Sequence, residues 1–162
     1  MTDLFERVVL PVASVGDAAA SARAIAPYDP GRVVAVHVIE KAGGAPDKAS
    51  VEQREEEAER IFAALEEGLA DVDLETDLRY GTDVADTIFA AAADHDATAV
   101  VITPRGGSRW IQLLTGDVAL DIVTETDRPV VVLPDVEDEA EGSGEGPEGT
   151  EGETATGEED GA

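Results

Sequence analysis

The fold is decided by one stretch, residues 100–134, which reads VVITPRGGSRWIQLLTGDVALDIVTETDRPVVVLP. It opens with a β-branched apolar run of the kind that is buried on both faces of a parallel sheet. A glycine-containing loop follows, then Gly116 in front of a helical pattern over 117–125, then a second β-branched run over 129–133. Strand, loop, helix and strand in this order predict an α/β unit.

The same alternation extends over the preceding hundred residues. Strand-type runs occupy residues 6–13, 32–39, 74–80, 97–102 and 129–133. Helical patterns occupy residues 15–27, 51–69, 83–93 and 117–125. Residues 74–80 alternate apolar and polar, as a half-buried edge strand does, and Ser50 with Gln53 predicts a capping box for the second helix. The order βαβαβαβαβ predicts a doubly wound, Rossmann-like α/β fold, with a five-stranded parallel sheet and helices on both faces.

A change of composition after Pro134 marks the end of the predicted domain, residues 1–134. Residues 135–162 contain 12 acidic residues, no basic residue and seven glycines, and Val136 is their only large apolar side chain. Such a segment buries too little apolar surface to offset the entropy of ordering. We therefore expect residues 135–162 to form a disordered acidic tail.

Charge and composition exclude several classes of function. The chain has 37 acidic and 11 basic residues, a formal charge of −26. This balance disfavours nucleic-acid binding, which needs Lys and Arg at phosphates, and docking on anionic membranes. Without cysteine there is no disulfide framework, thiol catalysis or cysteine zinc site. No apolar stretch is long enough to span a membrane and residues 1–7 have no signal pattern, so we expect a soluble cytoplasmic protein.

The acidic excess also extends over the predicted domain. Residues 1–134 keep a net charge of −14, Lys41 and Lys48 are the only lysines, and there is no asparagine. Self-repulsion of such a surface destabilises a protein at low salt, and screening relieves it. We favour adaptation to high salt over an ordinary acidic protein.

The loop between the last two strands is the strongest candidate for binding chemistry. A helix N-terminus after a glycine-containing loop is suited to an anion, because its free N–H groups and dipole face outward. Arg105 and Arg109 add positive charge there. The alternative, that the glycines only permit tight turns, fits these residues equally well.

These segments together resemble the universal stress protein family. The resemblance covers residues 5–134 and rests on VVLPVA (8–13), RYGTDVADTIFAAA (79–92), the loop at 103–118 and DRPVVVLP (127–134). It implies a sheet of strand order 3-2-1-4-5, and many members of that family bind ATP through Gly-x2-Gly-x9-Gly-Ser/Thr after the fourth strand. It also implies a homodimer in which the last strands pair, here through Val130, Val131, Val132 and Leu133.

Carried over residue by residue, the ATP motif is degenerate. Its first glycine falls on Thr103, its second on Gly106, its third on Gly116, and its hydroxyl position on Asp117. The aspartate that contacts nucleotide after the family's first strand falls on Ala13. The candidate nucleotide-contacting residues are Pro11, Val12, Ala13, Val38, Thr103, Arg105, Gly106, Arg109, Gly116, Asp117 and Val118.

The sequence thus favours a non-enzymatic stress-response or regulatory module that acts as a homodimer with an unknown protein partner and binds no ATP. The first alternative is an ATP-binding stress switch that uses residues 103–118, with Val12 and Val38 walling an adenine pocket. The second is a soluble accessory to a membrane transporter. No catalytic residue and no metal site is expected, because His37 and His95 lack the convergent ligands that zinc needs and are interpreted as structural.

Overall fold

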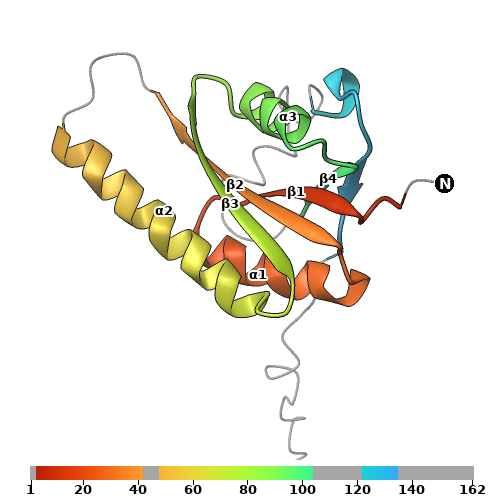
Figure 1. The fold of residues 1–162 in the computed structure, drawn as a ribbon. Coiled ribbons are helices and arrows are strands. Elements are labelled where there is room, and N and C mark those ends of the chain that lie inside the picture. Colours follow the sequence, from red (N-terminus) through yellow and green to blue (C-terminus); the bar gives the residue numbers. More distant parts are fainter. Residues whose placement is uncertain (1–2, 42–47, 104–121, 135–162) are drawn as a thin grey trace, which may run out of the picture.

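A computed structural model describes residues 3–41, 48–103 and 122–134 of the chain (Figure 1). The strands are β1 (Arg7–Pro11), β2 (Arg32–Glu40), β3 (Asp73–Gly81), β4 (Ala99–Ile102) and β5 (Val130–Val132). The helices are α1 (Val15–Ile25), α2 (Lys48–Gly68) and α3 (Val84–Asp94), with a short 3-10 turn, η1 (Ala26–Tyr28). Residues 122–125 are also helical.

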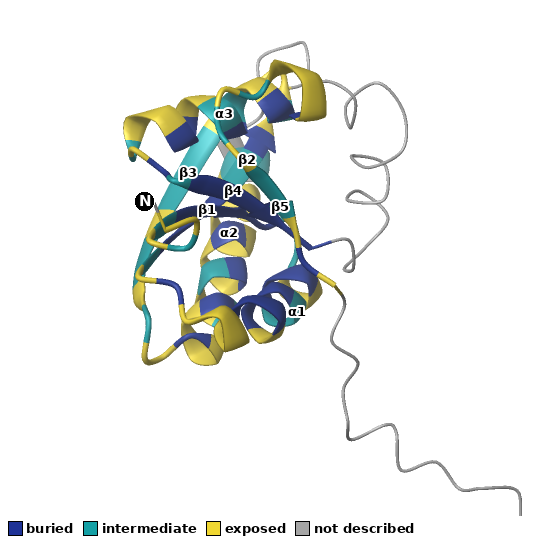
Figure 2. Ribbon diagram, turned by 90° about the vertical axis from the view of Figure 1, so that its right-hand side faces the viewer, coloured by how far each residue is buried: buried dark blue, intermediate teal, exposed yellow. Residues whose placement is uncertain are grey.

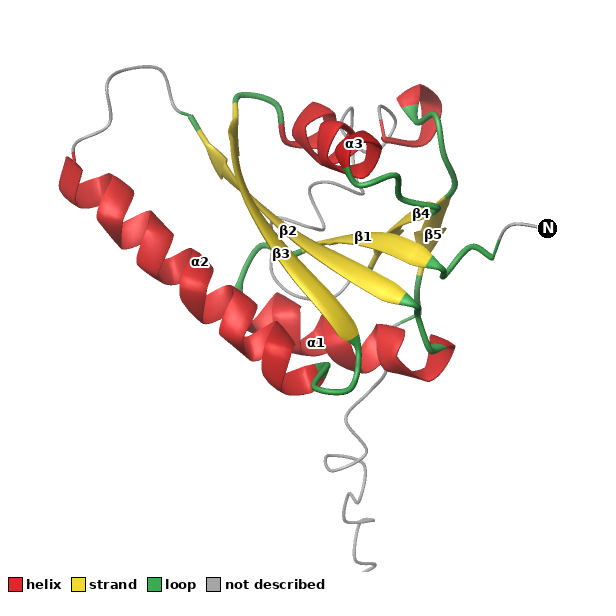
Figure 3. Cartoon of the chain, in the orientation of Figure 1, coloured by secondary structure: helices red, strands yellow, loops and turns green. Residues whose placement is uncertain are grey.

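The five strands form one parallel sheet in the order β3-β2-β1-β4-β5. Figure 3 shows α1 and α2 on one side of this sheet and α3 on the other. The predicted α/β class and the strand order implied by the resemblance are both confirmed. The alternating segment becomes β3, an edge strand that pairs with β2 over its whole length.

Two apolar clusters fill the space between the sheet and its helices. The α1–α2 core contains Leu10 of β1 and Ile61 of α2, whereas the α3 core contains Val9 of β1 and Ile88 of α3. Successive strand residues point to opposite faces, so β1 contributes to both cores. Figure 2 shows the result: the central strands β1 and β4 are buried, and the helices are exposed on their outer faces and buried toward the sheet.

Helix starts follow the expected capping chemistry at two places. Ser14 Oγ accepts the N–H of Asp17 at 3.1 Å and caps α1, and Asp83 Oδ1 accepts the N–H of Asp86 at 2.9 Å and caps α3. The predicted capping box of Ser50 is wrong, because α2 already begins at Lys48 and Ser50 lies inside the helix.

Candidate functional site

The candidate residues described by the structure gather at the carboxyl ends of β1, β2 and β4. In the strand order, β2 and β3 follow outward from one side of β1, whereas β4 and β5 follow outward from its other side. Such a reversal is where doubly wound folds bind ligands. Pro11 ends β1, Val38 lies near the end of β2, and Thr103 follows β4. We call this place the switch-point edge.

The side chains at this edge face two different cores. Ala13 and Val38 are half-buried, and both pack on the α3 core. Val12 is only 2% exposed and packs in the α1–α2 core instead. Of the two valines expected to wall an adenine pocket, Val38 therefore keeps exposed surface and Val12 does not.

The exit of β1 is held by the first turn of α1. Asp17 Oδ2 accepts the N–H of Ala13 at 2.8 Å, and Asp17 is 1% exposed. The free N–H groups and dipole of the first helical turn stabilise a carboxylate placed there. Position 13 thus presents a methyl group, and its backbone N–H is already bonded.

The exit of β4 is held by the same helix. Ser21 Oγ lies 2.6 Å from Thr103 Oγ1, and both residues are buried. The hydroxyl of Thr103 is therefore engaged by α1. Asp17 and Ser21 lie one turn apart on α1, and sequence reasoning missed both because neither belongs to a recognisable motif.

The remaining candidates of the loop, Arg105, Gly106, Arg109, Gly116, Asp117 and Val118, lie outside the described residues. The predicted dimer residues are described. Val130 and Val131 are half-buried, Val132 is 53% exposed, and Leu133 is buried in the α1–α2 core. At the β5 edge, the side chain most available to a partner is that of Val132.

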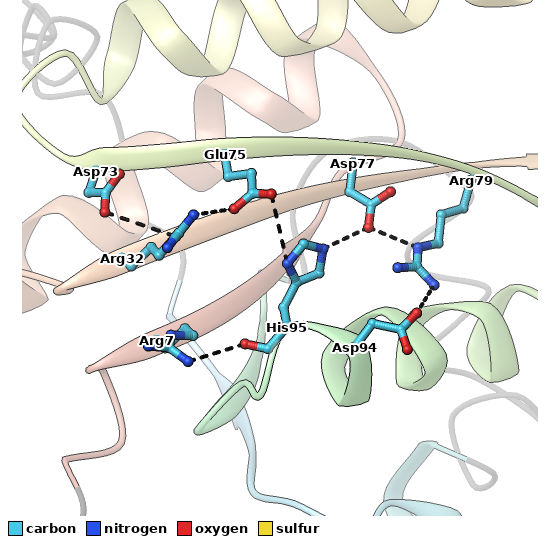
Figure 4. A network of polar contacts seen from close by, with 8 residues as sticks. All are labelled: Arg7, Arg32, Asp73, Glu75, Asp77, Arg79, Asp94 and His95. Atoms are coloured by element: carbon cyan, nitrogen blue, oxygen red, sulfur yellow. Dashed lines mark hydrogen bonds and ion pairs between the residues drawn. The ribbon is translucent and has the colours of Figure 1, made fainter.

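Both histidines make contacts inside the domain. His37 Nδ1 lies 2.8 Å from the carbonyl oxygen of Val12, which joins β2 to the exit of β1. His95 follows α3, and its Nε2 lies 2.8 Å from Asp77 Oδ2 while its Nδ1 lies 3.9 Å from Glu75 Oε1 (Figure 4).

Polar contacts continue from His95 along β3. Arg79 donates from Nε to Asp77 Oδ2 at 2.8 Å and from Nη1 to Asp94 Oδ2 at 2.9 Å. Burial works against the charge of Arg79, but the hydrogen bonds to Asp77 and Asp94 outweigh it and raise its pKa. Arg32 of β2 pairs with Glu75 and lies 3.9 Å from Asp73. The alternation of Asp73, Glu75, Asp77 and Arg79 is the sequence signal that could have revealed this network.

Within residues 3–41, 48–103 and 122–134, no group of three or more His, Asp or Glu side chains is arranged to hold a metal ion. No helix in that part of the chain combines the length and apolar character needed to cross a bilayer.

The model of the universal stress protein family matches residues 4–134. The chain belongs to that family. The match covers all but the first three residues of the predicted domain and includes the switch-point edge and the loop that follows β4.

Solved structures of the family share this fold at low sequence identity. A universal stress protein from Archaeoglobus fulgidus in complex with dAMP is 20% identical, with a TM-score of 0.53 over 81% of this chain and 99% of that one. One from Burkholderia pseudomallei is 18% identical, with a TM-score of 0.57 over 83% and 99%. One from Arabidopsis thaliana with AMP bound is 17% identical, with a TM-score of 0.51 over 83% and 94%. Among curated proteins, none matches the chain.

Proposed function

We propose that this universal stress protein is a non-enzymatic stress-response module that acts as a homodimer, engages a protein partner and does not hold ATP. The observation that carries the proposal is the exit of β1. There the half-buried Ala13 stands where the resemblance places a nucleotide-contacting aspartate, and its N–H is bonded to the buried Asp17.

The chemistry of this position argues against a nucleotide polyphosphate. A methyl group accepts no hydrogen bond from a ribose or a base, and the nearby carboxylate of Asp17 adds negative charge beside Ala13. Asp117 adds another carboxylate where the family motif has a hydroxyl. At 4 Å and an effective dielectric of 20, one like-charge pair costs roughly 4 kcal/mol. That corresponds to a loss of about three orders of magnitude in affinity.

An adenine-nucleotide switch is the second candidate, and specific observations favour it. Structures of the same fold have been solved with dAMP and with AMP. Ala13 and Val38 are half-buried apolar residues that both pack on the α3 core, and apolar surface of this kind suits the face of a base. Arg105 and Arg109 could neutralise a phosphate.

The proposed dimer would form at the β5 edge. β5 pairs with β4 alone among the described strands, so its other side has no described partner strand. Val132 of β5 is 53% exposed. An apolar sheet edge of this kind is a site for pairing with another chain. Because Leu133 packs inside its own protomer, the contact would rest on the backbone and on Val132.

Introducing the family's residues at positions 13 and 117 tests whether these two positions prevent ATP binding. The variant Ala13→Asp/Asp117→Ser should gain affinity for ATP in isothermal titration calorimetry with Mg²⁺ at high salt. The control Ala90→Asp/Asp71→Ser exchanges the same residue types at exposed positions, keeps the net charge equal and should gain nothing. An unchanged affinity in the first variant would show that these two residues are not what excludes ATP.

A further inference from the structure

The sheet has two edges of very different character. β3 is nine residues long and pairs with β2 alone among the described strands, so no described strand bonds the backbone groups along its outer side. β5, at the opposite edge, is three residues long and consists of Val130, Val131 and Val132. Unpaired edges of this kind are templates for pairing with another chain.

Two open edges on one molecule create a specific hazard. If β3 of one copy paired with β5 of the next, the contact would be head-to-tail and could repeat without closing. A two-fold contact that joins β5 to β5 closes after two copies. A closed dimer therefore requires that β5 pairs with a strand of the second copy and that β3 does not.

Charged side chains occupy every second position of β3 from Asp73 to Arg79. Asp73, Glu75, Asp77 and Arg79 all lie on the side of the strand that faces the end of α3 (Figure 4). Asp77 and Arg79 are largely covered, with side chains 19% and 22% exposed. Inward-pointing charges on an edge strand are one way in which natural sheets prevent edge-to-edge pairing.

The neighbouring elements hold these charges in place. Asp77 Oδ2 is 2.8 Å from both Arg79 Nε and His95 Nε2, and Arg79 reaches Asp94 of α3 at 2.9 Å. On the other side of His95, Glu75 pairs with Arg32 of β2. The backbone carbonyl of His95 accepts from Arg7 of β1 at 3.5 Å.

Much of this network still touches water. The exposed fractions of the side chains are 67% for Asp73, 65% for Asp94, 41% for Arg32 and 39% for Glu75. A strand laid along β3 would cover these groups and remove water from the carboxylates. Ion pairs lose hydration on burial, and the loss can exceed their mutual attraction. The valines of β5 carry no such cost.

We propose that the ion network of β3, His95 and the end of α3 keeps this edge closed to a strand of a second copy, so that self-association through the sheet can use only the β5 edge. This inference is independent of whether the protein binds nucleotide. It can also be tested apart from the proposed dimer, because the charges of β3 can be removed whether the parent protein is a monomer or a dimer.

The test replaces the central charged residues of β3 with threonine, an uncharged residue that favours strands. The variant Glu75→Thr/Asp77→Thr/Arg79→Thr should remain folded and should associate beyond the state of the parent protein. Sedimentation velocity at about 1 M KCl, where the Debye length is about 3 Å, screens the general repulsion of the acidic surface. We expect the average mass of this variant to rise about twofold or more over the concentration range, as open-ended assembly requires. The average mass of the parent protein should stay constant over the same concentration range.

A matched control removes the same charges elsewhere. Glu52→Gln/Glu59→Gln/Arg60→Gln changes the net charge equally on the exposed face of α2 and should sediment like the parent protein. If circular dichroism shows that the triple threonine variant is unfolded, the variant Asp73→Thr/Glu75→Thr replaces it in the same sedimentation experiment. Its two side chains are more exposed than those of Asp77 and Arg79, so their loss should disturb the fold less. A folded β3 variant with the parent's mass distribution overturns the proposal, and so does equal association of the α2 control.

Discussion

Ser21 and Thr103 are buried hydroxyls that depend on each other. Their oxygens lie 2.6 Å apart, at 0% and 5% exposure. Ser21→Ala should lower the free energy of unfolding by about 1–3 kcal/mol, because it leaves the Thr103 hydroxyl buried without this partner. Thr103→Val should do the same to Ser21. In urea melts at constant salt, the double variant should lose less than the sum of the two, and strict additivity would contradict the coupling.

Tyr80 and Glu55 allow a pH measurement on a single contact. Tyr80 donates its hydroxyl to Glu55 Oε1 at 2.6 Å, and this hydrogen bond raises the pKa of Tyr80. The contribution of this hydrogen bond to the free energy of unfolding is therefore present below the ordinary tyrosine pKa of about 10. It is lost as the pH rises through the higher pKa that Tyr80 has in the folded protein. In a Tyr28→Phe background, Glu55→Gln should move the phenolate absorbance titration of Tyr80 to lower pH. A titration that does not move would show that the contact is absent in solution.

At the scale of single residues, the sequence predicted which strand ends carry the candidate residues, but it did not predict the contacts that these residues make. Ala13 and Val38 pack on the same core, but Val12 packs in the other because adjacent positions on an extended chain face opposite ways. The acceptor for the N–H of Ala13 is Asp17, four residues later. Contacts such as Ser21 to Thr103 join residues that are 82 positions apart, and single-sequence patterns carry no signal for them.

The crossing of α1 and α2 depends on the absence of a side chain at Gly68. A Cβ there would lie 2.6 Å from the Cβ of Ala22, which is closer than two carbon atoms approach when they are not bonded to each other. Gly68→Ala should therefore force the helices apart and destabilise the domain by about 1–3 kcal/mol.

Gly16 is the matched control on α1. A Cβ at Gly16 meets nothing within 4 Å, so Gly16→Ala should stabilise the domain by about 0.5–1 kcal/mol through helix propensity. Thermal or urea unfolding measures both variants. Equal effects at the two glycines would contradict the packing argument.

The elements themselves were largely predictable from local patterns. All five strands lie within two residues of the predicted bounds, because long β-branched runs and helical stripes are strong signals. The ends differ where local chemistry decides. α1 stops at Ile25, ahead of the predicted end at Pro27, because the chain enters the η1 turn and Asp29 takes a left-handed conformation with φ of 49°. Residues 117–121 of the last predicted helix lie outside the described residues.

At the scale of the whole molecule, the boundary at Pro134 stays a prediction, since residues 135–162 lie outside the described part. A chain ending at Pro134 should fold and dimerise like the full chain, because the removed segment has almost no apolar surface to dock. Differential scanning calorimetry at matched salt compares the two. A loss of more than a few degrees in melting temperature would show that residues 135–162 dock on the domain.

Salt adaptation is the second prediction at this scale. With a formal charge of −26, screening of self-repulsion should dominate and the melting temperature should rise with KCl. The ion pairs of β3 act in the opposite sense, because salt weakens them. A flat or falling curve of melting temperature against KCl would contradict adaptation to salt.

We propose above that this universal stress protein works without bound ATP. The most direct measurement is nucleotide content and affinity of the purified full chain at high salt with Mg²⁺, by chromatography of the extracted protein followed by calorimetric titration of ATP and AMP. We expect the purified protein to contain no nucleotide and to give no heat of ATP binding. Co-purified nucleotide, or micromolar ATP binding, would contradict it and would establish the nucleotide switch in its place.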